Sequence, residues 1–386
     1  MEQLLAVAPG GLDIFLQQLI NGLTTGTLFA LIAIGYTMVY GIIELINFAH
    51  GDLFMLGAFL ALTLVGWMGL AGASAAMGMF GLLLMTALAT PVFIAGANMP
   101  LRPLAARLPQ LRLAGAVTGL IGAAAFIALC VGTTKAISSA AGGAAGPGLK
   151  FVAIVLLFLL CMSFCASLNF TVDRLVYKPL RGAPKLTPLV SAIGVSFMFM
   201  GFGQIWKGVA DINFPDLIPN RNLLGSDAVR FTLKDLIVVF VTVPLMIGLT
   251  LFVKYTKLGK AMRATAQNPT AARLMGIDVD RVIGATFVIG GSLAGAASVI
   301  YALSINTVSF QMGYQNGLYA FTAAVLGGIG NLPGAMLGGI IIGLVRSLGS
   351  QYVGEQWTSA LVFAILIVIL VFRPSGLLGA RTREKV

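Results

Sequence analysis

The stretch LQQLINGLTTGTLFALIAIGYTMVYGIIELINFAHGD, residues 16–52, carries no charged side chain until it places Glu44, Asn47, His50 and Asp52 within nine positions. Its apolar part exceeds the roughly 20 residues with which a helix crosses a lipid bilayer. Glycines bracket the polar group, so we predict that the spanning helix breaks or ends there.

The composition of the whole chain agrees with this opening span. Of 386 residues, 58% are hydrophobic and 10% are charged, against about 25% charged residues in soluble domains. No charge-rich stretch is long enough to hide a soluble domain, so residues 1–386 are predicted to form a single transmembrane domain. The net charge of +11 comes from short loops between apolar runs, where it fixes topology and does not indicate nucleic-acid binding.

Apolar runs divide the chain into segments of membrane-spanning length. The fold class is therefore all-α, a polytopic integral membrane protein with about 8–10 transmembrane helices. The runs are residues 14–40, 53–71, 76–97, 113–134, 151–172, 188–206, 236–253, 282–303, 318–346 and 357–372.

Basic residues gather in three internal loops and the tail, which we predict to be cytoplasmic. The segment 207–235 balances four basic residues against four aspartates, as expected of an external loop. The basic residues are Arg102, Arg107 and Arg112; Arg174, Lys178, Arg181 and Lys185; Lys254, Lys257, Lys260, Arg263, Arg273 and Arg281; and Arg373, Arg381, Arg383 and Lys385.

The run 318–346 contains GGIGNLPG at residues 327–334. Glycine and proline at mid-depth leave backbone groups unpaired, which is tolerated only where protein or water covers them. We predict a broken or re-entrant segment, with two half-helices meeting at Asn331 and Pro333. One long kinked helix is the alternative.

The longest cytoplasmic loop, residues 254–281, carries signals for a short helix at about 269–275. Asn268 suits the N-cap, Pro269 suits the first helical position, and Gly276 can take the left-handed turn that follows. Asp278 is predicted to cap the next membrane helix.

This short helix carries Leu274 and Met275 beside Arg273, with little local core to bury them. An exposed apolar pair with a charged rim indicates a docking surface for another protein. A loop helix lying on the membrane or on its own protein is the alternative.

The sequence lacks the motifs of several chemistries. It has no phosphate-binding loop, so the chain is not expected to hydrolyse ATP. One histidine with two carboxylates at this spacing does not suit a metal site. The three cysteines, Cys130, Cys161 and Cys165, lie in apolar runs and are predicted to pack as small hydrophobes. We therefore expect neither catalytic nor metal-binding residues.

Two interpretations of the polar stretch stay open. Its side chains either cap a helix end at the cytoplasmic interface, or line or gate a solute path. The residues considered for the path or its gate are Glu44, Asn47, His50, Asn331 and Pro333.

The sequence resembles the LivH-type permeases of ATP-binding-cassette (ABC) importers for branched-chain amino acids and related amides. Besides residues 16–52, the resemblance is carried by RATAQNPTAARLMGIDVDRVIGATFVIG, residues 263–290, and by AFTAAVLGGIGNLPGAMLGGIIIG, residues 320–343. Residues 72–150 look longer than in shorter members of that family, which leaves the number of early spans open.

The resemblance implies a permease of the bacterial inner membrane with its C-terminus in the cytoplasm. Its partners would be two cytoplasmic ABC ATPase subunits, a second related permease and a periplasmic substrate-binding protein. ATP and Mg would bind to the ATPases, and this chain would bind no cofactor. The residues expected to couple to an ATPase are Asn268, Pro269, Ala271, Arg273, Leu274, Met275 and Gly276.

Two other classes of function fit the sequence less well. A stand-alone channel or facilitator for a small neutral solute such as urea explains the scarcity of intramembrane charge but gives the docking loop no purpose. A membrane-embedded enzyme needs catalytic residues converging at one depth, and the residues around His50 are too sparse for that.

Overall fold

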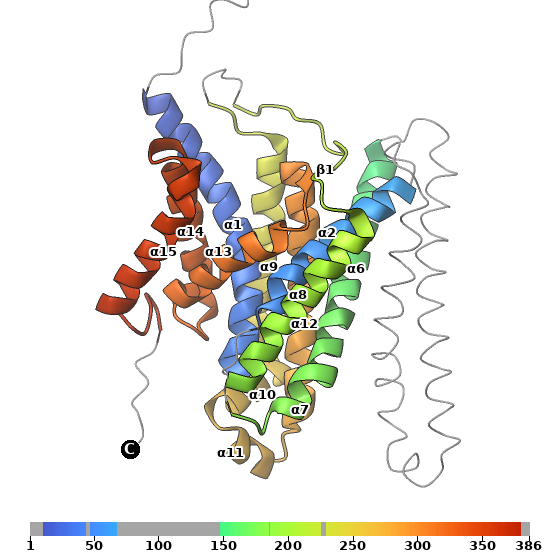
Figure 1. Cartoon of the computed structure of the whole chain (residues 1–386), viewed down its shortest axis with the longest axis vertical. Coiled ribbons are helices and arrows are strands. Elements are labelled where there is room, and N and C mark those ends of the chain that lie inside the picture. Colours follow the sequence, from blue (N-terminus) through green and yellow to red (C-terminus); the bar gives the residue numbers. More distant parts are fainter. Residues whose placement is uncertain (1–10, 44–46, 68–146, 185, 225–228, 380–386) are drawn as a thin grey trace, which may run out of the picture. The chain divides into compact units, whose positions relative to one another are not determined.

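Long apolar helices dominate the computed structural model, which describes residues 11–43, 47–67, 147–184, 186–224 and 229–379 (Figure 1). In chain order the elements are α1 (Gly11–Ile43), α2 (Ala49–Trp67), α6 (Pro147–Val172), the π-helix η2 (Asp173–Tyr177), α7 (Lys178–Leu180), α8 (Leu186–Lys207), β1 (Ile212–Asn213), α9 (Leu233–Tyr255), α10 (Lys257–Gln267), α11 (Pro269–Leu274), α12 (Val279–Ile305), β2 (Thr307–Val308), α13 (Met312–Gly327), α14 (Leu332–Tyr352) and α15 (Glu355–Phe372).

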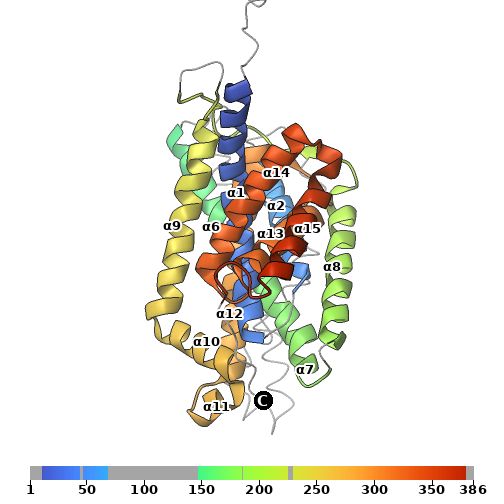
Figure 2. The same ribbon diagram turned by 90° about the vertical axis from the view of Figure 1, so that its left-hand side faces the viewer.

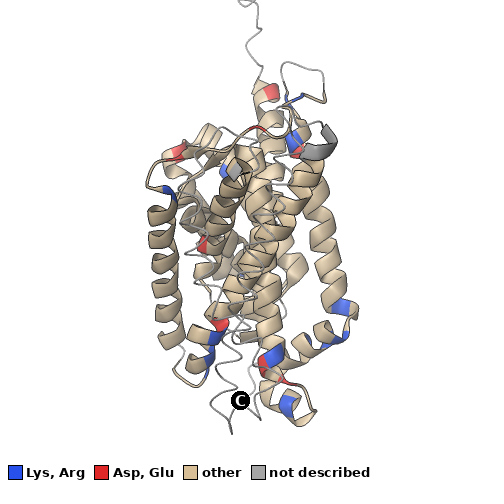
Figure 3. Cartoon of the chain, turned by 90° about the vertical axis from the view of Figure 1, so that its right-hand side faces the viewer, with Lys and Arg blue, Asp and Glu red and all other residues tan. Residues whose placement is uncertain are grey.

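Eight helices in the described ranges are long and apolar enough to cross a membrane. This confirms the all-α polytopic prediction, and α15 (Glu355–Phe372) matches the predicted run 357–372 within two residues. The predicted runs 76–97 and 113–134 lie outside the described residues. Figure 3 shows that most charged residues lie near the helix ends, as expected when the middle of each helix meets lipid.

The described residues fall into two compact units. The first contains residues 1–37, 218–256 and 318–386, and the second contains residues 38–217 and 257–317. Helices α1 and α13 each contribute residues to both units.

In the second unit, α12 packs against α6 and α2, and α2 also packs against α8. Helices α12 and α6 touch through their backbones, because a Cβ added at Gly295 would lie 2.4 Å from the carbonyl oxygen of Cys161. Cys161 and Cys165 are buried free thiols, which confirms their predicted packing role. Cys130 lies outside the described residues.

The short strands β1 and β2 pair antiparallel in this unit. Ile212 lies opposite Val308, and Asn213 lies opposite Thr307. The pairing follows the end of α12, where Asn306 takes a left-handed conformation with φ 58° and donates a side-chain hydrogen bond to Asp216 at 2.6 Å.

In the first unit, α14 runs antiparallel to α1 at very short distance (Figure 2). Gly22 lies against Leu344, and Gly339 lies against Ala30. A Cβ added at Gly339 would lie 2.4 Å from the Cα of Ala30, so only glycine permits this approach.

Helices α13 and α14 form an antiparallel hairpin at the predicted break. A Cβ added at Gly338 would lie 2.1 Å from the carbonyl oxygen of Ala323, and one added at Gly327 would lie equally close to that of Gly334. The break at 328–331 is confirmed, and one long kinked helix is wrong for this segment.

The prediction of two half-helices is wrong for α14, which has 21 residues and is long enough to cross a membrane alone. Asn331 and Pro333 lie where this helix begins, and their depth in the membrane stays a prediction. The hairpin turn is also bound to the chain that follows α15, since Leu377 donates a backbone hydrogen bond to Leu326 at 2.9 Å. Glycine and proline therefore make a turn where one helix ends and the next begins.

We expect Gly339→Ala to destabilise the protein by about 1–3 kcal/mol, because the added methyl group overlaps the α1 backbone. Gly349→Ala in the same helix is the control, since its Cβ would meet nothing closer than a Leu361 methyl group at 3.7 Å. That control should be neutral, or stabilising by up to about 1 kcal/mol from helix propensity. Thermal unfolding in detergent compares the two, and equal midpoints would contradict the close approach.

Candidate functional site

The candidate site is built on α11, which starts where the sequence places its N-cap. Asn268 has an extended backbone, and its side-chain oxygen accepts hydrogen bonds from the backbone N–H groups of Thr270 and Ala271, both at 3.0 Å. Pro269 follows at the first helical position. The predicted helix at about 269–275 is confirmed as Pro269–Leu274.

The C-terminal end of α11 closes with a Schellman motif. The N–H of Gly276 donates to Arg273 and the N–H of Ile277 donates to Ala272, both at 3.0 Å. Gly276 has a φ of +81°, which a residue with a Cβ adopts only with strain. The predicted left-handed turn at Gly276 is confirmed, and it fixes the direction in which the chain leaves the helix.

Two large apolar side chains project from this end of α11. Leu274 is 84% exposed and Met275 is 82% exposed, while Ala272 on the opposite side is buried. The predicted exposure of both side chains is confirmed. Packing inside the described chain therefore does not explain why these two positions carry large apolar residues. All seven residues predicted to couple to an ATPase, Asn268, Pro269, Ala271, Arg273, Leu274, Met275 and Gly276, are exposed.

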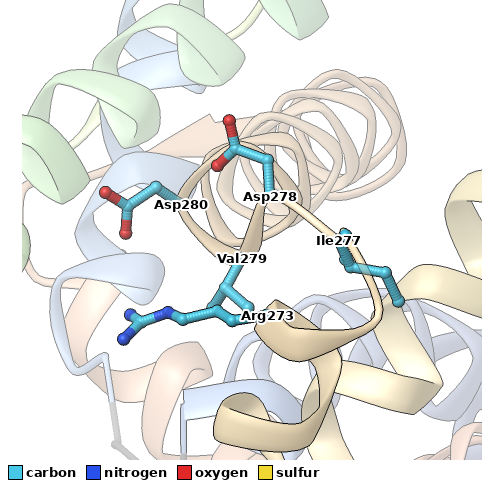
Figure 4. A pocket seen from close by; sticks show the side chains of 6 residues that line it. Arg273, Ile277, Asp278, Val279 and Asp280 are labelled. Atoms are coloured by element: carbon cyan, nitrogen blue, oxygen red, sulfur yellow. The ribbon is translucent and has the colours of Figure 1, made fainter.

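An open pocket of about 380 Å³ lies beside α11, where the chain turns into α12. In Figure 4 the Arg273 guanidinium and the Asp280 carboxylate point to the same side, and Ile277 points to the other. The pocket therefore has one charged side and one apolar side. Its lining residues are Arg273, Gly276, Ile277, Asp278, Val279 and Asp280.

Asp278 caps α12 as predicted. Its carboxylate accepts the backbone N–H of Arg281 at 3.1 Å and pairs with the Arg281 side chain at 2.9 Å. Both side chains of this ion pair are about half exposed or more, so the pair stabilises the helix end only modestly.

A second group of ion pairs holds the same helix end to α7 and η2. Asp280 accepts from Arg181 at 2.6 Å and from Lys178 at 2.9 Å. Arg181 also pairs with Asp173 at 2.5 Å, and the Asp173 side chain is fully buried. We call Asp173, Lys178, Arg181 and Asp280 the ionic joint.

The ionic joint was not predicted from the sequence. Lys178 and Arg181 were assigned to topology alone, and neither was paired with Asp280. The available signal was the presence of Asp173 and Asp280 inside segments otherwise dominated by positive charge. Through this joint, the short connection from α11 to α12 is anchored to the end of α6.

The polar stretch after α1 does interrupt the helix. Helix α1 ends at Ile43 and α2 begins at Ala49, which confirms the predicted break. Glu44 lies outside the described residues.

Asn47 is buried in a polar network between helices. It donates to the Asn169 side chain at 3.2 Å and accepts from the Tyr177 hydroxyl group at 2.8 Å. Asn169 in turn donates to the backbone carbonyl of Phe287 in α12 at 2.7 Å. Its contacts are therefore with protein, and a part in gating stays a prediction.

His50 and Asp52 lie in the first turn of α2 and are also buried, each 1% exposed. Asp52 accepts a hydrogen bond from Ser196 of α8. This partner differs from those of Asn47.

Asn331 caps α14 and fastens the hairpin turn. Its side-chain oxygen accepts the N–H of Gly334 at 3.1 Å, and its side-chain nitrogen donates to Leu378 at 2.6 Å. Pro333 lies in the first turn of the same helix. Neither observation tests a role of these two residues in a solute path.

Comparison with known proteins identifies close relatives along nearly the whole chain. Residues 18–371 match the family described as branched-chain amino acid transport system / permease component. The chain is 34% identical to the high-affinity branched-chain amino acid transport system permease protein BraD of Pseudomonas aeruginosa, over 96% of this chain and 98% of the relative. It is also 34% identical to the permease protein LivH of Escherichia coli, with the same coverage. No solved structure matches the chain.

We expect Arg181→Gln to cost about 3–5 kcal/mol of stability, because it leaves the buried Asp173 carboxylate without its partner. Arg281→Gln removes an exposed pair and should cost at most about 1 kcal/mol. Unfolding midpoints in detergent measure both. If Arg181→Gln lowers the unfolding midpoint no more than Arg281→Gln does, the ionic joint does not stabilise the folded protein.

Proposed function

This chain belongs to the family of permease components of branched-chain amino acid transport systems, and we propose that it imports branched-chain amino acids or related small amides as the membrane subunit of an ABC importer. In this proposal both compact units belong to one permease domain, residues 1–386. The chain is non-catalytic and uses the energy of ATP hydrolysed by its partners.

The observation that carries the coupling proposal is the exposed apolar pair Leu274 and Met275 on a helix closed at both ends. A short helix presenting such side chains suits a groove on a partner protein. The N-cap at Asn268 and the Schellman turn at Gly276 resist unwinding of α11. A force exerted by a partner protein therefore moves α11 as a rigid unit.

The ionic joint connects α11 to the membrane helices, so a displacement of α11 reaches them. Helix α12 begins five residues after α11 ends, and Asp280 near its start is held by Lys178 and Arg181. Movement of α11 is thereby transmitted to both α12 and the end of α6, whose backbones touch at Gly295. We propose that these two helices move together when the ATPases close.

The assembly that fits this role contains two cytoplasmic ABC ATPase subunits, a second related permease and a periplasmic substrate-binding protein. ATP and Mg belong to the ATPases, since this chain has no phosphate-binding loop of its own. The location is the bacterial inner membrane, with α11 and the C-terminus in the cytoplasm, as the basic loops and tail favour.

Residues at two helix starts are proposed to border the solute path. Asn47 and His50 lie at the start of α2, and Asn331 and Pro333 lie at the start of α14. Their described positions support a role in fixing helix ends beside the path. Glu44, next to the end of α1, is proposed to take part in the same region.

We expect Leu274→Asp to weaken association with the ATPase at least about tenfold, since a carboxylate placed in an apolar contact must be desolvated. Leucine uptake by the complex should fall in parallel. Leu224→Asp is the control, because Leu224 is also exposed, at 55%, in the loop predicted to be external. Copurification of the coexpressed subunits and uptake into proteoliposomes are the measurements.

Full association and uptake with Leu274→Asp would contradict the coupling role of α11. Failure of the unmutated chain to copurify with any ATPase would contradict the importer proposal as a whole, and would favour a stand-alone facilitator.

A further inference from the structure

Helix α14 carries an arginine within a membrane-spanning segment of the first unit. Arg346 lies between Leu332 and Tyr352, the ends of the span. Charged residues inside spans are costly and usually functional, so its surroundings are informative.

The guanidinium group of Arg346 is held by two aromatic rings. It lies 5.6 Å from the ring centroid of Phe29 and 5.2 Å from that of Tyr319, and the two rings are 5.5 Å apart. The Tyr319 hydroxyl group is within 2.8 Å of the Ser359 hydroxyl group, which fixes that ring against α15. Cation–π contacts of this kind orient an arginine without neutralising its charge.

The rings hold the charge level with the middle of α14. Ala30, next to Phe29, lies against Gly339, whereas the Arg346 backbone is seven residues, or about 10 Å, further along α14. A guanidinium that reaches Phe29 must therefore point back along the helix toward its N-terminus. It lies level with the middle of α14, a helix about 30 Å long, and points away from the nearer end of that helix.

The charge has no acid partner among the described residues. Asp173, Asp278 and Asp280 do form ion pairs, but they belong to the second unit and pair with basic residues of that unit. The Arg346 side chain is only half-buried, so the described protein does not cover all of it. Hydrocarbon does not tolerate exposed N–H donors of a cation, so N–H groups that the protein leaves uncovered are expected to face water.

We propose that Arg346 is a binding residue on the translocation path and receives the α-carboxylate of the amino acid in transit. The inference rests on the proposed function for the class of ligand. A guanidinium whose faces are stacked presents its edge, which matches a carboxylate with two parallel hydrogen bonds. The absence of a fixed acid partner keeps the contact transient, because the ligand displaces only water.

The test uses Arg346→Cys in a chain whose Cys130, Cys161 and Cys165 are replaced by alanine, assembled with its partner subunits in proteoliposomes. We expect leucine uptake to fall at least tenfold while the complex and its ATP hydrolysis remain. Ethylammonium methanethiosulfonate, which restores a positive charge at the introduced thiol, should recover uptake several-fold. The anionic sulfonatoethyl reagent should react without recovery.

Arg346→Met separates charge from packing, since a thioether also packs against aromatic rings. We expect its uptake to be as low as that of Arg346→Cys. Normal uptake by Arg346→Met, an introduced thiol that neither reagent reaches, or equal effects of the two reagents would each overturn the inference. Lack of leucine uptake by the cysteine-free parent and the unmutated complex alike would instead overturn the proposed function.

Discussion

Close backbone contact between helices is the constraint on which the structure depends. Lipid is as apolar as leucine, so burying leucine between two membrane helices contributes little to their association. The free energy of helix association must therefore come from dispersion and short backbone contacts, and these contacts require residues without a side chain. Gly295 provides such a contact between α12 and α6 in one unit, and Gly339 provides one between α14 and α1 in the other.

The lipid environment also constrains the polar side chains inside the helical units. A buried amide or hydroxyl group that lost its partner would find no water, so its hydrogen-bond partner has to come from protein. Asn47 illustrates this requirement, because its partners Asn169 and Tyr177 come from a distant part of the chain. The network links the break before α2 to α6, η2 and α12, and makes the position of that break part of the packing.

Features encoded within a few residues could be predicted from the sequence. Apolar run lengths predicted the described spans, and the caps at Asn268, Gly276 and Asp278 predicted α11 and the start of α12, because each cap acts on neighbouring backbone groups. Pairings between distant residues could not be predicted. Arg181 and Asp280 are 99 positions apart, and only the fold shows that they meet. The break between α13 and α14 was placed correctly, but α14 is longer than the predicted half-helix, since its apolar run was divided at the wrong length.

The position of the ionic joint argues for a mechanical role beyond stability. A buried ion pair is often no more stabilising than apolar residues of the same volume, because desolvation offsets the attraction between the charges. What such a pair does provide is a defined geometry, since Arg181 must meet Asp173 and Asp280 at once. An apolar contact at the same place would let α12 slide or rotate against α6. In the proposed coupling, α11 transmits movement to two membrane helices, and a joint of fixed geometry suits that role better than an apolar contact that allows sliding.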